Sequence, residues 1–472
     1  MDVNEFFAEE EQQQPNPRRK KRDPRKEMLR TYGPYALVLL LIILFIIFAV
    51  GSIKRSNAKR EAARQESLAA YESSVAEQAA WDAEAADILA KAGAMAAGYD
   101  YDGAIALIDS FSGELYLYDD LLNLLDACIA GKEKLIPWND PSTIVNLSFN
   151  LLIADPDRAF AHKKYGESFY KNFITVSEFT NILTQLYENN YVLVDLDDFL
   201  EISTTESGVE AFTYKPILLP EGKKPLVLTQ THVNYNTYMT DGDGDGLPDK
   251  DGGGFASRLI LDGNGNLTCE LVDKSGKTVT GAYDMVPILN TFIKAHPDFA
   301  YRGARAIVAV SAYDGLFGYR TDPETAEKIS EEFYQQQLKD VKPVIDALRR
   351  DGYTIACYTY ENVAYGSIST ERLQKDLAKW QEEALPLLGD VDVLVYAKNS
   401  DLEEYTGEKF TALTDAGFRY FLGFCNNHKS WLQLNSSYVR QGRILIHGAN
   451  LERNAYLYGG LFDPETVFDP SR

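Results

Sequence analysis

The uncharged segment "YALVLLLIILFIIFAVGSI", Tyr35 to Ile53, constrains this chain more than any other feature. At a rise of about 1.5 Å per residue, a helix of this length crosses roughly 30 Å, which is the thickness of the hydrocarbon layer of a membrane. A cleaved signal peptide has a shorter apolar core and a small-residue cleavage site, whereas Lys54 and Arg55 follow here directly. We therefore expect one transmembrane helix over 35–53 that remains as an anchor.

The charges on either side of this segment predict its orientation. Eight Lys and Arg residues precede it, all between Arg18 and Arg30, and a smaller basic group from Lys54 to Arg60 follows it. The denser cluster favours a cytoplasmic N-terminus by the positive-inside rule. We expect a cytoplasmic tail over 1–34 and a single-pass protein of the cell membrane whose large C-terminal part is extracellular.

The charge balance excludes one class of partner. The part of the chain beyond the apolar segment carries 39 basic and 63 acidic residues. Because phosphate binding requires a basic face, we expect no nucleic-acid partner. The four cysteines are far apart and form no CxxC pair, so we expect buried thiols rather than a zinc ribbon or a disulfide framework.

A helical stalk is predicted over 54–135. Asn57 to Lys132 is rich in Ala, Glu and Gln and contains no proline, which favours two or three helices. The stretch "AGYDYDGAIALIDSF" from Ala97 resembles a tetratricopeptide helix junction, but a single copy cannot build a solenoid. The stalk is interpreted as a spacer or packing element, and a protein partner that binds through it remains an alternative.

A change of pattern after "IPWNDPST", Ile136 to Thr143, predicts a domain over 140–465. Short apolar strands there alternate with helices, including one long helix from Pro323 to Arg350. This alternation favours an α/β fold with a parallel sheet closed into a (β/α) barrel, whose site would lie at the carboxyl ends of the strands. The predicted strands begin at Thr143, Tyr191, Pro225, Arg305, Tyr353, Val391, Phe418 and Arg443.

Several stretches of this domain resemble, in the right order, landmarks of a known family. They include "ITVSEFTNILTQLYENNYVLVDLDDF", "KPLVLTQTHVNYNTYM", "LFGYRT", "LRRDGYTIACYTYENVAYGSIS" and "YTGEKFTALTDAGFRYFLGF". They are similar to the polysaccharide deacetylase family with NodB homology, carbohydrate esterase family 4, and especially to its membrane-anchored Gram-positive members. The resemblance implies a distorted (β/α) barrel with a groove for a glycan such as peptidoglycan, and hydrolysis of N-acetyl groups by a metal-bound water.

This sequence departs from the family at the positions that carry the chemistry. Where the family has an aspartate base and an aspartate metal ligand, "TQTHV" offers Thr231 and His232; where the family has two histidines, "CYTYEN" offers Tyr358 and Asn362. A threonine hydroxyl is no base near neutral pH, and neutral tyrosine and asparagine are poor metal ligands. A catalytic zinc site requires three good protein ligands, so a catalytic divalent metal is doubtful and we expect no ordinary deacetylase site.

Other residues are weaker candidates for the same site. On spacing alone, His232 could simply be a strand-end histidine that bonds a backbone group. His447 in "LIH" superficially matches a late family motif but is also explained as a strand-end histidine. Because sugars bind on aromatic faces, Tyr235 and Tyr238 are candidates for a groove wall, and His428 and Trp431 could line the groove.

An acidic insertion, "DGDGDGLPDKDGG" over 241–253, follows the strand that carries Thr231. Its carboxylates match the ligand positions of a calcium loop, with Gly246 as the turn glycine, although Gly252 stands where the bidentate glutamate belongs. The alternative is a solvated acidic loop. The possible Ca²⁺ ligands are Asp241, Asp243, Asp245, Asp249 and Asp251.

Three functions remain open from the sequence. The first is a membrane-anchored, deacetylase-like protein that binds or organises cell-wall polysaccharide without ordinary hydrolysis, a pseudoenzyme. The second is an active carbohydrate esterase that uses a rearranged metal site around His232, His428 or His447. The third is a structural partner of other envelope proteins through the stalk.

Overall fold

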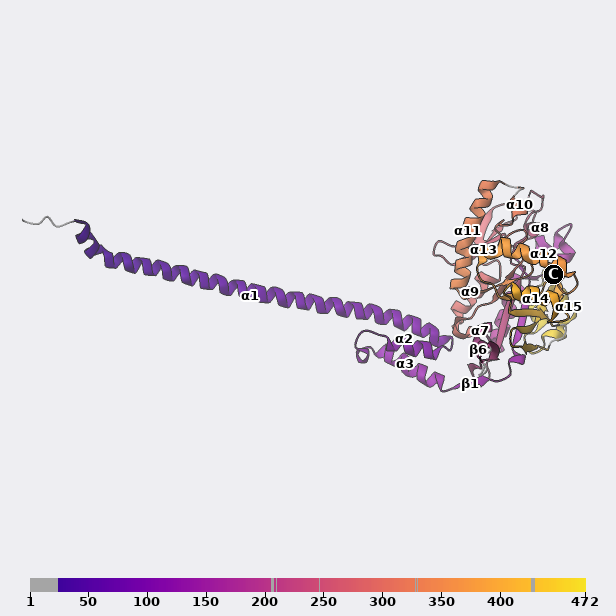
Figure 1. Ribbon diagram of the computed structural model, residues 1–472, viewed down its shortest axis with the longest axis horizontal. Coiled ribbons are helices and arrows are strands. Elements are labelled where there is room, and N and C mark those ends of the chain that lie inside the picture. The colour runs from indigo at the N-terminus through magenta and orange to yellow at the C-terminus, as the bar shows by residue number, and fades with distance from the viewer. Residues whose placement is uncertain are drawn as a thin grey trace, which may run out of the picture. The chain divides into compact units, whose positions relative to one another are not determined.

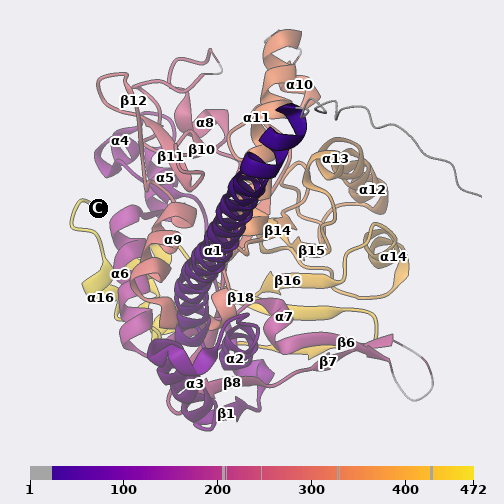
Figure 2. The ribbon, with the colours of Figure 1, turned by 90° about the vertical axis from the view of Figure 1, so that its left-hand side faces the viewer.

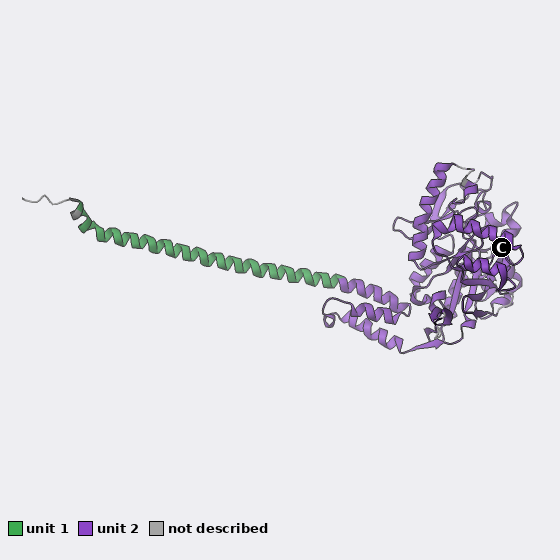
Figure 3. Ribbon diagram, viewed as in Figure 1, with its two compact units in different colours: residues 1–83 green, residues 84–472 purple. Residues whose placement is uncertain are grey.

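The computed structural model describes residues 24–204, 208, 210–245, 247–326, 328, 330–425 and 429–472. The chain divides into two compact units, residues 1–83 and residues 84–472 (Figure 3). Helix α1 (Pro24–Ala97) contains the apolar segment and is drawn in indigo to purple in Figure 1. Its most apolar window has a mean hydropathy of 3.2 and is 0 % buried, so α1 is long and apolar enough to cross a membrane.

Two further helices follow α1, namely α2 (Tyr101–Asp109) and α3 (Asp119–Lys132), and both belong to the unit over 84–472. The turn before α2 is bonded to the barrel domain. Tyr99 Oη donates to the Asp298 carbonyl at 2.9 Å, and the Arg302 amide donates to the Gly98 carbonyl at 2.7 Å. The stretch that resembles a tetratricopeptide junction therefore packs against the barrel within this unit.

Seven parallel strands close into the predicted barrel. Around the ring the order is β13, β14, β15, β16, β18, β2 and β9, and β9 pairs again with β13. The eighth predicted strand, β5 (Tyr191–Leu193), lies beside β9 outside the ring. The bounds of the ring strands are β2 (Val145–Phe149), β9 (Lys224–Thr231), β13 (Ile307–Val310), β14 (Thr354–Cys357), β15 (Val393–Val395), β16 (Tyr420–Phe424) and β18 (Val439–Ile446).

Helices cover the outside of the barrel (Figure 2). On one flank lie α6 (Val176–Glu188), α9 (Met285–Ala295) and α16 (Pro464–Val467), and on the other lie α12 (Thr370–Lys379), α13 (Leu385–Leu388) and α14 (Gly407–Asp415). The prediction of one helix from Pro323 to Arg350 is wrong. The structure has α10 (Pro323–Ala326) and α11 (Glu331–Arg350), because Ser330 is extended and its Oγ caps α11 by accepting the Phe333 amide.

Side chains alternate between the two faces of each strand and separate two cores. On β9, Leu226 and Leu228 belong to the larger apolar cluster under the helices, whereas Val227 belongs to a smaller cluster inside the barrel. Toward the carboxyl ends the barrel interior becomes polar. Thr229 Oγ1 donates to Asn146 Oδ1 at 2.9 Å, and the buried Arg443 donates to Ser148 Oγ at 2.7 Å.

Three small antiparallel sheets were not expected from the sequence. They are the β1–β8 pair, the β6–β7 hairpin and the β10–β11–β12 sheet, and the last one flanks the acidic insertion. Their bounds are β1 (Leu135–Trp138), β8 (Ile217–Pro220), β6 (Leu200–Thr204), β7 (Glu210–Tyr214), β10 (Arg258–Leu261), β11 (Leu267–Val272) and β12 (Thr278–Gly281). All four cysteines are buried thiols, as expected.

Candidate functional site

The carboxyl ends of β9, β13 and β14 bring four predicted or newly recognised side chains together. These strands are neighbours in the ring, so the residues that follow them share one end of the barrel. His232 follows β9, Tyr313 follows β13, and Tyr358 and Asn362 follow β14. The His232 ring centroid lies 5.9 Å from that of Tyr358 and 6.3 Å from that of Tyr313. We call these four residues the strand-end centre.

His232 is a neutral imidazole in this centre. Its side chain is 8 % exposed, and Tyr313 Oη lies 3.4 Å from its Nε2. Burial lowers the pKa of His232 to about 4, although Asp314 nearby acts to raise it. At neutral pH the ring therefore keeps a lone pair on one nitrogen, as a metal ligand or a hydrogen-bond acceptor requires.

Thr231 cannot serve as a base in this structure. Its side chain is 1 % exposed, and its Oγ1 lies 2.8 Å from Asn150 Oδ1 and 3.1 Å from the Phe149 carbonyl oxygen. Both neighbours accept hydrogen bonds, so the hydroxyl proton is held between two oxygens of the chain.

Tyr313 and Asn362 bond each other across the centre. Burial, with a smaller contribution from Asp314, raises the pKa of Tyr313 to about 12, although a hydrogen bond from Asn362 acts to lower it. The Asn362 Oδ1 atom is buried and has no partner among the described residues. The centre therefore offers phenol, amide and imidazole groups, which suit hydrogen bonding to a neutral polar ligand better than they suit a hard divalent cation.

Unusual backbone conformations gather at the same end of the barrel. Positive φ values occur at His232 (66°), Asp314 (64°), Thr359 (57°) and Asn362 (51°), each in a loop that follows a ring strand. Such conformations are costly for residues other than glycine and persist where the surrounding structure fixes them. Holding these loops in one conformation around the centre therefore lowers the stability of the folded protein.

A groove of about 790 Å³ is lined by the segment before α5 (Gly166–Asn172), by residues of α8 (Thr237–Thr240) and by the acidic insertion. Tyr165, which precedes α5, and Tyr238 of α8 lie in its wall with ring centroids 5.4 Å apart. Burial raises the pKa of the Tyr238 phenol, and so do the neighbouring Tyr313, Tyr165, Asp314 and Tyr358. Because Tyr238 neighbours Tyr313 and Tyr358 as well as Tyr165, its ring joins the groove to the strand-end centre.

Two predicted groove residues lie elsewhere. Tyr235 is 1 % exposed and its hydroxyl donates to Asp284 Oδ2 at 2.6 Å, so the prediction of a groove wall at Tyr235 is wrong: its ring is buried under the strand ends. Trp431 precedes β17 (Leu432–Leu434), and the Arg440 guanidinium lies 5.2 Å from its ring centroid. His428 lies outside the described residues.

His447 also points away from the strand-end centre. It follows β18, and its Nδ1 lies 2.9 Å from the Lys171 carbonyl oxygen of α5, to which it donates. Burial lowers the pKa of His447, against the effect of this bond. The geometry is that of a strand-end histidine that fastens a helix.

The acidic insertion holds a grouping of three carboxylates. Ligand atoms of Asp241, Asp243 and Asp249 lie within 4.8 Å of one another and could hold a metal ion, and they form the only such grouping in the described part of the chain. Asp245 and Asp251 are not part of it. Asp245 Oδ1 accepts the Leu247 amide at 2.8 Å, and Asp251 is exposed at the rim of the groove. Gly246 lies outside the described residues.

Sequence reasoning missed Tyr313, Asp314 and Tyr165. The first two were recognisable, because "SAYDG" places a tyrosine and an aspartate directly after a buried strand. Asp314 organises the loop after β9: its Oδ2 accepts the Thr237 amide at 2.6 Å and Thr237 Oγ1 at 3.0 Å. The sequence around Tyr165 did not indicate a groove residue, because Tyr165 reaches the groove only through the packing of the segment around α5.

Comparison with known proteins finds little similarity in sequence or structure. No protein-family model and no curated protein matches this sequence. Among solved structures, the chain is similar to the Streptococcus pyogenes deacetylase PplD in complex with acetate, with 10 % sequence identity and a TM-score of 0.33. That superposition covers 66 % of this chain and 94 % of the other.

Proposed function

We propose that this protein is anchored by one membrane helix and binds cell-wall glycan with an extracellular barrel, without ordinary metal-dependent deacetylation. The observation that carries this proposal is the groove of about 790 Å³ whose wall includes Tyr165 and Tyr238 beside the strand-end centre. Aromatic faces with hydroxyl groups nearby suit sugar rings, which present apolar C–H faces and many hydroxyls. The family resemblance of the sequence supports a polysaccharide as the ligand.

The strand-end centre supports the non-hydrolytic half of the proposal. A metal-bound water mechanism requires ligands that hold the ion and a base that accepts the proton. Here the Thr231 hydroxyl is bonded to oxygens of the chain, and His232 belongs to no grouping of metal ligands within the described residues. The phenols and amides that remain can hold the acetamido groups of a glycan by hydrogen bonds.

Calcium is the ion proposed for Asp241, Asp243 and Asp249. Calcium favours several carboxylate oxygens in a flexible loop, and glycine-rich acidic loops provide them. Asp241 and Asp243 also line the groove, so an ion there would order one of its edges. Isothermal titration of the chelator-treated protein should show calcium binding that the Asp243→Asn variant weakens. An absence of heat at millimolar calcium would exclude the ion.

Glycan binding is tested with insoluble peptidoglycan and with an N-acetylglucosamine pentamer. Tyr238→Ala should weaken the binding of both glycans by about tenfold or more, as the truncation of a central aromatic contact does. Tyr116→Ala is the matched control, because Tyr116 is 68 % exposed and outside the groove. If a folded Tyr238→Ala variant binds as the unmodified protein does, the groove is not the site.

A further inference from the structure

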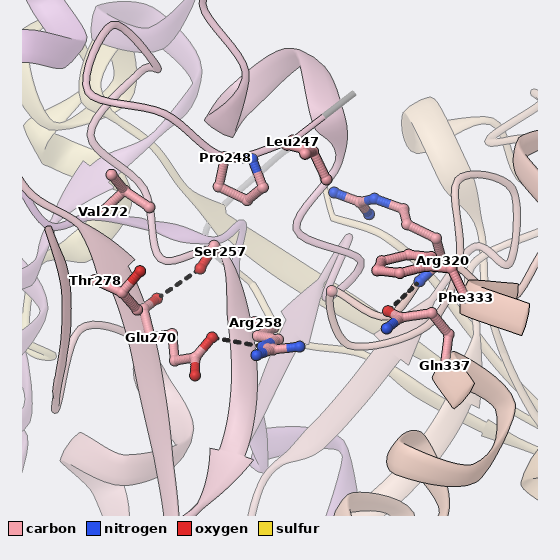
Figure 4. A pocket seen from close by; sticks show the side chains of 11 residues that line it. Leu247, Pro248, Ser257, Arg258, Glu270, Val272, Thr278, Arg320, Phe333 and Gln337 are labelled. Atoms are coloured by element: carbon pink, nitrogen blue, oxygen red, sulfur yellow. Dashed lines mark hydrogen bonds and ion pairs between the residues drawn. The ribbon is translucent and has the colours of Figure 1, made fainter. Parts of the chain in front are cut away.

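A second cavity, of about 250 Å³, lies on another side of the acidic insertion and takes no part in the proposed glycan site (Figure 4). Leu247 and Pro248 of the insertion lie over it. Strands β10 and β11 and helix α11 provide other walls through Arg258, Glu270 and Gln337. Its volume falls below the roughly 300–1,000 Å³ of sites for drug-sized ligands, so it suits a smaller molecule.

Arg320 supplies a buried positive charge to this cavity. Its side chain is 5 % exposed, and its Nη atoms donate to the carbonyl oxygens of Asp314 at 2.8 Å and Tyr235 at 3.0 Å. These two partners are neutral, but the carboxylate of Asp314 forms an ion pair with Arg320 at 3.9 Å, and Asp322 and Asp241 act with it to raise the pKa of Arg320 against the effect of burial. A bound carboxylate would add a charge-assisted hydrogen bond to this long ion pair, which favours an anion beside Arg320.

Two further donors point toward the same space. Arg258 Nε pairs with Glu270 Oε2 at 2.5 Å, which leaves both its Nη atoms without a hydrogen-bond partner in the described part of the chain. Gln337 is also 5 % exposed; its Oε1 accepts the Arg320 amide, while its amide nitrogen has no protein partner among the described residues. Figure 4 shows the guanidinium of Arg320 beside Leu247 and that of Arg258 on another side, joined to Glu270.

The rest of the lining is mixed. Leu247, Pro248, Val272 and Phe333 give it an apolar part, and Ser257 and Thr278 add hydroxyl groups. The geometry points to a binding site for a small carboxylate with a short apolar substituent, of the size of an N-acylated amino acid. The carboxylate lies between Arg258 and Arg320, which match it by paired N–H donors, and the substituent contacts Phe333 and Leu247. This site does not depend on glycan binding in the groove.

The experiment is isothermal titration of the full chain in detergent with N-acetylvaline. N-acetylvalinamide is the matched ligand, since it differs only in replacing the carboxylate by a neutral amide. N-acetylvaline should bind, and the amide should bind at least about tenfold more weakly, because charge-assisted hydrogen bonds are lost. Equal binding of the two ligands, or no binding of N-acetylvaline at 10 mM, would overturn the assignment. Inorganic phosphate that binds as tightly as N-acetylvaline would overturn the choice of a carboxylate.

Variants locate the site. Arg258→Gln should weaken N-acetylvaline by about tenfold to a hundredfold, and Arg258→Gln with Glu270→Gln should do the same without leaving Glu270 unpaired. Arg350→Gln is the control, because Arg350 lies outside the cavity and pairs with Asp351 at the surface. Phe333→Ala should weaken the binding of N-acetylvaline more than the binding of N-acetylglycine. Unchanged binding in both Arg258 variants, with unfolding temperatures like that of the unmodified protein, would refute the site.

Discussion

Replacing Asp284 by asparagine should change how stability depends on pH. Asp284 is 1 % exposed and accepts three hydrogen bonds, from Tyr235 Oη at 2.6 Å, Gln230 Nε2 at 2.7 Å and the Leu152 amide at 3.0 Å. Burial raises its pKa to about 6 even though these bonds act to lower it. The folded protein therefore holds a proton on Asp284 that an unfolded chain releases at lower pH.

The sign and size of this stability change follow from the pKa of Asp284 in the folded and in the unfolded protein. An unfolded aspartate has a pKa of about 3.9. Below this value both states are protonated and the carboxyl costs nothing; stability then falls as pH rises toward 6 and stays constant above it. A difference of about two pKa units corresponds to about 3 kcal/mol. Asparagine keeps an oxygen acceptor without the charge. The stability of Asp284→Asn relative to the unmodified protein should therefore rise by about 2 kcal/mol from pH 4 to pH 7, because the unfolded carboxyl is already about half ionised at pH 4.

Urea unfolding followed by tryptophan fluorescence, at several pH values between 4 and 7.5, measures this difference. Asp262→Asn is the control with the opposite sign. Asp262 is at the surface, and hydrogen bonds from Asn266 and Asn264 lower its pKa, so its contribution is lost as pH falls. A stability difference for Asp284→Asn that is flat with pH, or that decreases as pH rises, would refute the reasoning.

Two further predictions concern stability and topology. Arg472→Ala should destabilise the barrel unit by about 3–5 kcal/mol in the same urea titration. Both side chains of the Arg472–Glu178 pair are 0 % exposed, so the substitution leaves Glu178 charged and without its ionic partner. Arg453→Ala is the control, because Arg453 pairs with Glu452 at the surface and its loss should cost less than about 1 kcal/mol. Protease added to intact cells should remove the region beyond α1, because the basic cluster between Arg18 and Arg30 favours a cytoplasmic N-terminus; full protection, with a cytoplasmic marker intact, would contradict this topology.

The ring strands were predictable because each is a short buried apolar run. "PLVLTQT" and "RAIVAVSA" have this form, and the structure places β9 and β13 there side by side. The β6–β7 hairpin and the β10–β11–β12 sheet were not predictable in the same way. β11, for example, alternates buried and half-buried residues through "LTCELV", with Thr268 and Glu270 among the half-buried ones. Its pairing partners are decided by the turns on each side.

The strand-end centre was predictable in part, since parallel strands in one barrel end at the same face. That rule joins His232 to Tyr358 and Asn362 across more than a hundred residues of sequence. It cannot tell a groove residue from a buried one. Tyr235 and Tyr238 are three residues apart. Tyr235 is in the core, where its hydroxyl donates to Asp284, whereas Tyr238 is half-buried beside Tyr165. The partner that decides this lies 49 positions away in the sequence.

The most direct test of glycan binding without hydrolysis measures both properties on one sample. The full chain is mixed with acetylated peptidoglycan fragments in the presence of zinc, cobalt or manganese, and bound glycan and released acetate are quantified together. The positive control carries Thr231→Asp, His232→Asp, Tyr358→His and Asn362→His, which supplies the base and ligands that the family resemblance assigns to these positions. We predict bound glycan with no acetate above background from the unmodified protein, since losing a base alone costs about 10² to 10⁴ in rate. Acetate release that the His232→Ala variant abolishes would contradict the account and establish an active esterase with a rearranged site.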